Sequence, residues 1–286
     1  MKVAFIFPPS RRSFSLWYQY KVLATGLEEE GVRTSLLISY SNGLTHYDVK
    51  VWWAPFRTID FEQSRFKVDI IFNPIDTNDL SDFVIRRLKT RSKVVIVPST
   101  HNLELMRKHG INAELVPHGI MPEDIPEDCE LREDMYYVET RSFPIRRGTD
   151  IALSYNLNYL VTDKVFKDHK DFLKFMCTAG NIIAPSRGGA FDVEVLEALA
   201  MGMRVYYSAR KMFDYIKDIP PTFPIDGEYC NTEYGYDVYQ YGCYDNVIRV
   251  EELKEVPRPN AKMYIKSHSP REIAKRFMEV VDKWLS

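Results

Sequence analysis

The feature that most constrains this chain is a series of short apolar runs that proline or glycine ends and that helical patterns separate. The first run, KVAFIF (2–7), is apolar on both faces, as expected for a parallel strand inside a sheet. Further strands are expected at residues 32–39, 49–56, 68–74, 93–99 and 113–119. Apolar residues at helical spacing occur between them, at 16–27, 79–89 and 102–110. This alternation predicts an α/β fold with parallel sheets.

The pattern changes over residues 121–134, which hold seven acidic residues, one arginine and two prolines but few apolar residues. This composition is typical of a linker between domains. Beyond it the α/β pattern resumes, with strands expected at 181–186 and 204–209 on either side of a helix. The chain therefore has the pattern of two α/β domains in succession.

We expect a first domain over residues 1–120 and a second over 121–268. A C-terminal helix over 269–286 follows, and it has room to pack back on the first domain. Ser269 supplies its N-cap and Glu272 its capping-box acid, with a proline at the first helical position.

Composition excludes several classes of function. The 286 residues carry 38 basic and 40 acidic side chains, a net charge of −2, which argues against binding nucleic acid by bulk charge. No apolar run is long enough to cross a membrane, which leaves only peripheral contact open, and the N-terminal run is too short for a signal peptide. Four scattered cysteines indicate neither a zinc site nor a disulfide framework. A reduced, cytoplasmic protein is expected.

Residues 229–244 contain six of the 18 tyrosines. Aromatic rings stack on sugars and on apolar partner surfaces, so the stretch is a candidate contact with an acceptor or a partner. An irregular segment filled by large side chains is the alternative. Cys230 and Cys243 flank the cluster, and the sequence leaves open whether they are close.

The segment 181–208 carries the strongest chemical signal, although no dinucleotide, P-loop, nucleophile-elbow or metalloprotease motif is present. It has the pattern of strand, glycine-containing loop, helix and strand. A helix N-terminus behind such a loop suits an anion, and Arg187 can add charge. Glu197 follows on the helix, where its carboxylate can accept two hydrogen bonds from vicinal hydroxyls such as a ribose diol. A solvated glutamate is the alternative.

The same segment, APSRGGAFDVEVLEALAMG, keeps Pro185-Ser186, Phe191, Leu196-Glu197-Ala198 and Gly202. It resembles the nucleotide-sugar signature of the retaining glycosyltransferase group 1 family. VPSTHNLELMRKHGINAELVPHGI (97–120) is similar to the end of that family's first domain. FPIRRGTDIAL (143–153) is similar to the Arg-Lys-Gly segment that opens its second domain.

The resemblance implies a GT-B fold of two Rossmann-like domains whose parallel sheets face a central cleft. It implies a hexosyltransferase that uses a nucleoside-diphosphate sugar, UDP- or GDP-linked, with retention of configuration and with no metal or other cofactor. The acceptor would be an unidentified glycan, lipid or protein.

The resemblance also implies roles for individual residues. Glu197 corresponds to the ribose-binding glutamate, and Arg147, followed by Gly148, corresponds to the cation that contacts the diphosphate. Together with Asp192 these two are the expected catalytic residues. The further donor-site candidates are Arg141, Ser186, Arg187, Gly189, Phe191 and Val193. The candidates on the acceptor side or in the cleft are Ser10, Arg12 and His118.

Two positions depart from the family pattern. Gly189 replaces the family's first glutamate, which contacts the transferred sugar, and Asp192 replaces a loop glycine. Asp192 has two interpretations, as the N-cap of the following helix or as a contact to a sugar hydroxyl. These departures leave two alternatives open, a GT-B protein that binds nucleotides or sugars without catalysis and an enzyme of the sugar-nucleotide epimerase or phosphorylase type.

Overall fold

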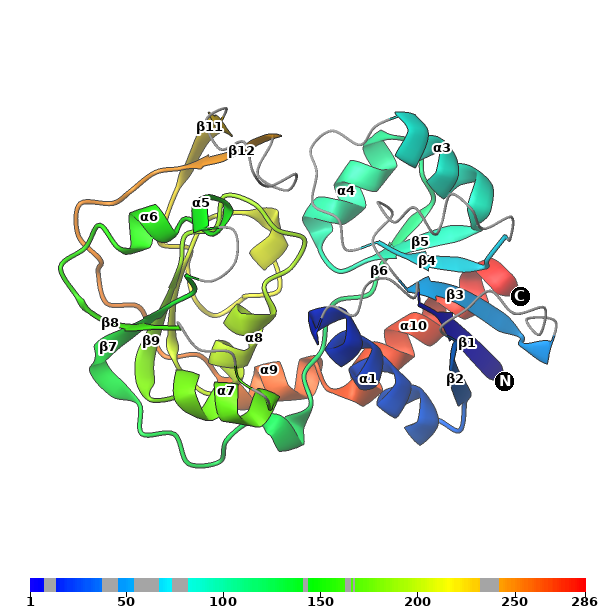
Figure 1. Ribbon diagram of the computed structural model, residues 1–286, viewed down its shortest axis with the longest axis horizontal. Helices are drawn as coiled ribbons and strands as arrows, with labels where there is room; N and C mark the ends of the chain where they lie inside the picture. Colours follow the sequence, from blue (N-terminus) through cyan, green and yellow to red (C-terminus); the bar gives the residue numbers. More distant parts are fainter. Residues whose placement is uncertain are drawn as a thin grey trace. The chain divides into compact units, whose positions relative to one another are not determined.

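The structure is a computed structural model that describes residues 1–7, 14–37, 46–53, 67–73, 82–140, 144–162, 166, 168–231 and 242–286 (Figure 1). The chain divides into two compact units. Unit 1 comprises Met1–Ile120 with His268–Ser286, and unit 2 comprises Met121–Ser267. Each unit contains a parallel β-sheet with α-helices, which confirms the predicted fold class.

Unit 1 is built on six parallel strands in the order β2-β1-β3-β4-β5-β6. The strands are β1 (Lys2–Ile6), β2 (Arg33–Leu37), β3 (Val49–Trp53), β4 (Ile70–Phe72), β5 (Val94–Val97) and β6 (Ala113–Leu115). The helices are α1 (Phe14–Glu29), α3 (Asp82–Arg91), α4 (Thr100–Lys108) and α10 (Pro270–Leu285). The interior strands of the sheet are apolar on both faces, as the continuous apolar runs predicted. This pattern suits a parallel sheet whose two faces are both covered by helices.

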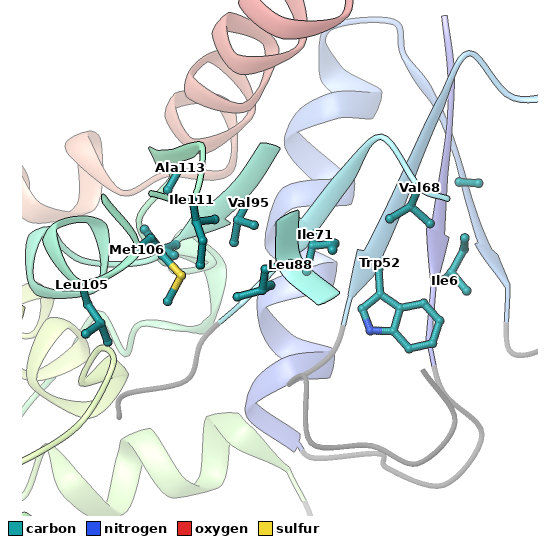
Figure 2. Close-up of a cluster of buried hydrophobic side chains, with 12 residues drawn as sticks. Ile6, Trp52, Val68, Ile71, Leu88, Val95, Leu105, Met106, Ile111 and Ala113 are labelled. Carbon is teal, nitrogen blue, oxygen red and sulfur yellow. The ribbon is translucent and has the colours of Figure 1, made fainter. Parts of the chain in front are cut away.

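One part of the unit 1 core lies between the strands and helices α3 and α4 (Figure 2). Ile71 of β4 and Val95 of β5 belong to the same buried cluster as Leu88 of α3 and Met106 of α4, and each of the four is at most 1% exposed. The helical spacing seen in the sequence thus corresponds to the helix faces that bury these side chains.

Helix α10 packs against α1. Ser269 caps α10, since its Oγ accepts a hydrogen bond from the backbone N–H of Glu272, and Pro270 opens the helix, as its sequence predicted. A Cβ on Gly26 of α1 would lie 2.0 Å from the carbonyl oxygen of Pro270. The close approach of the two helices therefore requires a glycine at position 26.

Gln19 of α1 holds the chain that follows β6. Its side-chain amide donates to the carbonyl oxygen of Gly119 at 3.0 Å, and its Oε1 accepts from the N–H of Gly119 at 2.8 Å. Gln19 is 3% exposed, so both backbone groups of Gly119 depend on this one side chain for their hydrogen bonds.

Replacing Gln19 by methionine is expected to lower the free energy of unfolding by about 2 kcal/mol, because a buried N–H and a buried carbonyl lose their partners. Lys21→Met, at an exposed position of the same helix, is the control and should change it by less than about 0.5 kcal/mol. Urea unfolding followed by circular dichroism measures both. Equal effects of the two substitutions would contradict the structural role of Gln19.

Unit 2 contains four parallel strands in the order β10-β9-β7-β8. The strands are β7 (Arg132–Val138), β8 (Asn158–Val161), β9 (Ala179–Ala184) and β10 (Arg204–Tyr207), and an antiparallel pair comprises β11 (Ile225–Asn231) and β12 (Gly242–Val247). The helices are α5 (Pro144–Arg147), α6 (Thr149–Ala152), α7 (His169–Met176), α8 (Val193–Ala200) and α9 (Ala261–Ser267), with short 3₁₀ turns η2 (Pro122–Asp124) and η3 (Lys211–Phe213).

The linker prediction was wrong for residues 132–134, which begin strand β7. The strand is hard to recognise in the sequence because its first three residues are exposed and only its last two, Tyr137 and Val138, are buried. The carboxylate of Glu133 forms ion pairs with Arg204 and Arg258, which balance its charge at the start of the strand.

The tyrosine-rich stretch forms part of the β11–β12 pair, and its residues 232–241 lie outside the described part of the chain. In the register of this pair, Cys230 lies opposite Cys243. Tyr244 of β12 is buried and contacts the loop after β9, since a Cβ on Gly188 would lie 2.6 Å from the Tyr244 ring.

Candidate functional site

The strand order of unit 2 indicates where a ligand would bind along its sheet. The connection after β7 leads to β8 on one side, and the chain then returns to β9 on the other side of β7 (Figure 1). Open parallel sheets bind ligands at the carboxyl ends of strands where the order reverses in this way. Here the carboxyl end of β7 leads to Glu139 and α5, and that of β9 leads to residues 185–192 and α8.

A close backbone contact joins these two segments. Gly148 has a φ of +71°, and a Cβ at this position would lie 2.1 Å from the carbonyl oxygen of Pro185. The backbone N–H groups of Arg187 and Gly188 both donate to the carbonyl oxygen of Arg146, at 2.8 and 3.2 Å. The chain after β7 is thereby held against the loop after β9.

Arg187 reinforces the same contact. Its two terminal nitrogens donate to the two carboxylate oxygens of Asp150 at 2.6 and 2.8 Å, and one of them also donates to the carbonyl oxygen of Ile145. The side chain of Arg187 is only 6% exposed. The guanidinium of Arg187 thus holds the loop against α5 and α6. The sequence pattern instead predicted that this charge would be available to a bound phosphate.

Arg147 and Asp192 form a second ion pair at this edge. The Arg147 Nη1 donates to Asp192 Oδ2 at 2.6 Å, and the side chains are 22% and 3% exposed. Asp192 stands at the N-cap of α8, but its side chain makes no capping hydrogen bond. The capping interpretation therefore holds for position only, because the guanidinium of Arg147 engages the carboxylate instead.

Two further carboxyl groups lie beside Arg147. Burial raises the pKa of Glu194 well above its ordinary value, and the neighbouring Glu139 adds to this. Glu139, Arg147, Ser186 and Asp192 share with Glu194 the lining of a cavity of about 10 Å³, which holds about one water molecule. The enclosed space is thus too small for a sugar.

Glu197 lies on α8 and is completely buried, which excludes its interpretation as a solvated glutamate. Its Oε1 is 2.6 Å from His169 Nε2, while its Oε2 has no hydrogen-bond partner among the described residues. Burial raises the pKa of Glu197 and His169 opposes the rise. The imidazole of His169 has a raised pKa because the Glu197 carboxylate outweighs the effect of burial. The pKa of each group therefore depends on the other through this hydrogen bond.

His169 was not among the candidates that the sequence supplied. It opens helix α7 behind the N-cap Asp168, whose side chain accepts from the N–H of Lys170. A capped helix start is a readable signal, but nothing local indicates that its first side chain meets a glutamate 28 positions later.

The other candidate residues of the loop after β9 have different surroundings. Phe191 stacks on Tyr215 with ring centroids 4.6 Å apart, and the Tyr215 hydroxyl donates to the carbonyl oxygen of Asp192. Gly189 has a φ of +150°, so the glutamate that the family has there would be strained in this loop. Ser186 is buried, and its carbonyl oxygen accepts from Ser208 Oγ at 2.7 Å.

Three candidates, Ser10, Arg12 and Arg141, lie outside the described residues. His118 belongs to unit 1, where its ring is 5.6 Å from that of Phe72 and burial lowers its pKa to about 3. Across the described ranges, no group of three or more His, Cys, Asp or Glu side chains is placed to hold a metal ion. None of the helices described is both long and apolar enough to cross a membrane.

The two units, each built on a parallel sheet, have the fold of the solved structures to which the chain is similar, which is the GT-B fold. The chain is similar to Anabaena HepE in complex with UDP-glucose, with 9% identity over 99% of this chain and 95% of that one and a TM-score of 0.53. It is also similar to sucrose-phosphate synthase from Thermosynechococcus elongatus, with 14% identity over 100% and 95% of the two chains and a TM-score of 0.51. No protein-family model matches the sequence, and no curated protein is significantly similar to it. At these identities the structural similarity establishes the fold alone, and it is the fold expected from the sequence.

Proposed function

We propose that the protein is a glycosyltransferase that moves a hexose from a nucleoside-diphosphate sugar to a glycan, lipid or protein acceptor with retention of configuration. The observation that carries this proposal is that Arg147 follows β7 and the buried Glu197 follows β9, the two strands at which the strand order of unit 2 reverses. HepE, which shares the fold, is described with UDP-glucose, and this supports a UDP-linked donor ahead of a GDP-linked one.

In this proposal the carboxylate of Glu197 binds the ribose of the donor. Its Oε1 already accepts from His169, and Oε2 is an acceptor without a partner in the described part of the chain. A buried carboxylate oxygen without a partner can accept a strong, charge-assisted hydrogen bond from a sugar hydroxyl.

Arg147 and the first turn of α8 would bind the diphosphate. Arg147 is the last residue of α5, and the backbone N–H groups from Phe191 to Val193 lie at the positive end of the α8 dipole. Such groups stabilise the charge that develops on a leaving diphosphate. Asp192 has to release Arg147 for this contact, and its carboxylate is then available to a hydroxyl of the transferred sugar.

Substitution of Glu197 by glutamine tests the ribose role, since it keeps shape and removes charge. UDP affinity is expected to fall about tenfold or more, the equivalent of a lost charged hydrogen bond. Glu130→Gln, at an exposed position of the same unit, is the control and should bind as the wild type does. Isothermal titration with UDP, GDP, ADP and dTDP measures the affinities, and unchanged binding by Glu197→Gln would refute the assignment.

Hydrolysis of the corresponding nucleotide sugars distinguishes enzyme from binding protein. A transferase is expected to hydrolyse its donor slowly in the absence of an acceptor. Binding without turnover across UDP-, GDP-, ADP- and dTDP-sugars would instead define a nucleotide-binding protein on this fold, with Gly189 and Asp192 as the altered positions.

A further inference from the structure

The pair of His169 and Glu197 joins two helices at the candidate site. His169 is the first residue of α7 and Glu197 lies on α8, five positions beyond its N-cap. The side chain of His169 is 14% exposed and that of Glu197 1%, so the hydrogen bond between them is largely shielded from water. In a shielded site a single hydrogen bond fixes a carboxylate much more firmly than it does at a surface.

In the described part of the chain, the acidic groups that act on His169 or Glu197 each have a partner of their own. Asp124 of η2 pairs with Lys170 at 3.6 Å and Asp168 accepts from the N–H of Lys170, while Asp192, which acts on Glu197, pairs with Arg147. The electrostatic surroundings therefore favour a protonated imidazole beside Glu197.

The arrangement leaves the two oxygens of Glu197 in different states. Oε1 is committed to His169, while Oε2 is buried and has no partner among the residues described. A carboxylate whose rotation is stopped through one oxygen presents the other in a fixed direction. A ligand hydroxyl that reaches this second oxygen forms a hydrogen bond with it and binds more tightly. A ligand that lacks the hydroxyl leaves a buried charge without a hydrogen bond.

We propose that His169 is a positioning residue that holds the Glu197 carboxylate for recognition of a ribose diol and thereby makes the site select ribonucleotides over 2′-deoxyribonucleotides. This inference rests on the proposed function, because it concerns the nucleotide that the donor carries. His169 is not one of the residues for which the family resemblance implies a role.

The test compares the affinities of UDP and 2′-deoxy-UDP in three proteins by isothermal titration. The wild type is expected to prefer UDP about tenfold or more, the difference that a missing hydroxyl opposite a buried carboxylate produces. His169→Leu removes the hydrogen bond, and the preference should fall to about two- to threefold. His169→Gln keeps an N–H donor near the position of Nε2 and should retain most of the preference.

The ratio of the two affinities separates positioning from a general structural role. A variant that only loosens the fold weakens both ligands together and leaves the ratio unchanged. If the wild type binds UDP and His169→Leu keeps the wild-type ratio, the inference is overturned while the proposed function stands. If the wild type binds none of the nucleoside diphosphates, the proposed function fails and the inference with it.

The titration of His169 gives an independent readout that needs no ligand. In the wild type the pKa of His169 is expected to lie above 6.5, because the neighbouring carboxylate favours the protonated ring. In Glu197→Gln the ring loses the carboxylate while Asp124 and Asp168 still act on it, so the pKa of His169 should be lower than in the wild type. Proton–nitrogen NMR across pH measures both, and equal pKa values in the two proteins would show that the pair does not exist in solution.

Discussion

Replacing Gly148 by alanine is expected to lower the free energy of unfolding by about 4 kcal/mol. The φ of +71° costs an alanine about 1 kcal/mol, and its Cβ would stand 2.1 Å from the carbonyl oxygen of Pro185. A backbone carbonyl cannot rotate away as a side chain can. Relief of the clash therefore moves the α5–α6 segment away from the loop after β9 and weakens the hydrogen bonds to the carbonyl oxygen of Arg146.

Gly227 offers a matched control in the same unit. Its φ is +74°, but a Cβ there meets nothing within 4 Å, so Gly227→Ala carries the conformational cost without the clash. About 1 kcal/mol of destabilisation is expected for this control. Chemical unfolding of the two variants measures the difference, and similar losses would show that the contact with Pro185 does not constrain the fold.

Replacing Asp192 by asparagine is expected to change stability and nucleotide affinity in opposite directions. The free energy of unfolding should fall by about 3 kcal/mol, because the largely buried guanidinium of Arg147 loses the carboxylate with which it forms its ion pair. The affinity for UDP should rise about tenfold, since a diphosphate no longer competes with a carboxylate for Arg147.

Thermal unfolding and isothermal titration on the same samples give the two quantities. Asp226→Asn, at an exposed position of β11, controls for the loss of one negative charge and should change neither by more than about 0.5 kcal/mol. A variant at position 192 that binds UDP more weakly than the wild type would show that Asp192 assists the donor, and that Arg147 is not held back by it.

The regular elements of unit 1 were readable because their signals are local. The apolar run at residues 2–7 and the capped start of the C-terminal helix each depend on near neighbours in the chain, and the structure has β1 and α10 at these places. Strand β7 was missed for the opposite reason. Its first three residues are charged and exposed, and the arginines that pair with Glu133 lie 71 and 125 positions further along the chain.

For the candidate site, the sequence by itself determined the segment and the residue types. It indicated the glycine-containing loop, the helix that follows, a glutamate on that helix and an arginine before Gly148. The partners of these residues were decided by the tertiary structure, which brings Arg147 to Asp192 across 45 positions and His169 to Glu197 across 28. Periodicity and capping act within a few residues, whereas such pairs exist only because the strand order places the chain after β7 against the loop after β9 and α7 beside α8.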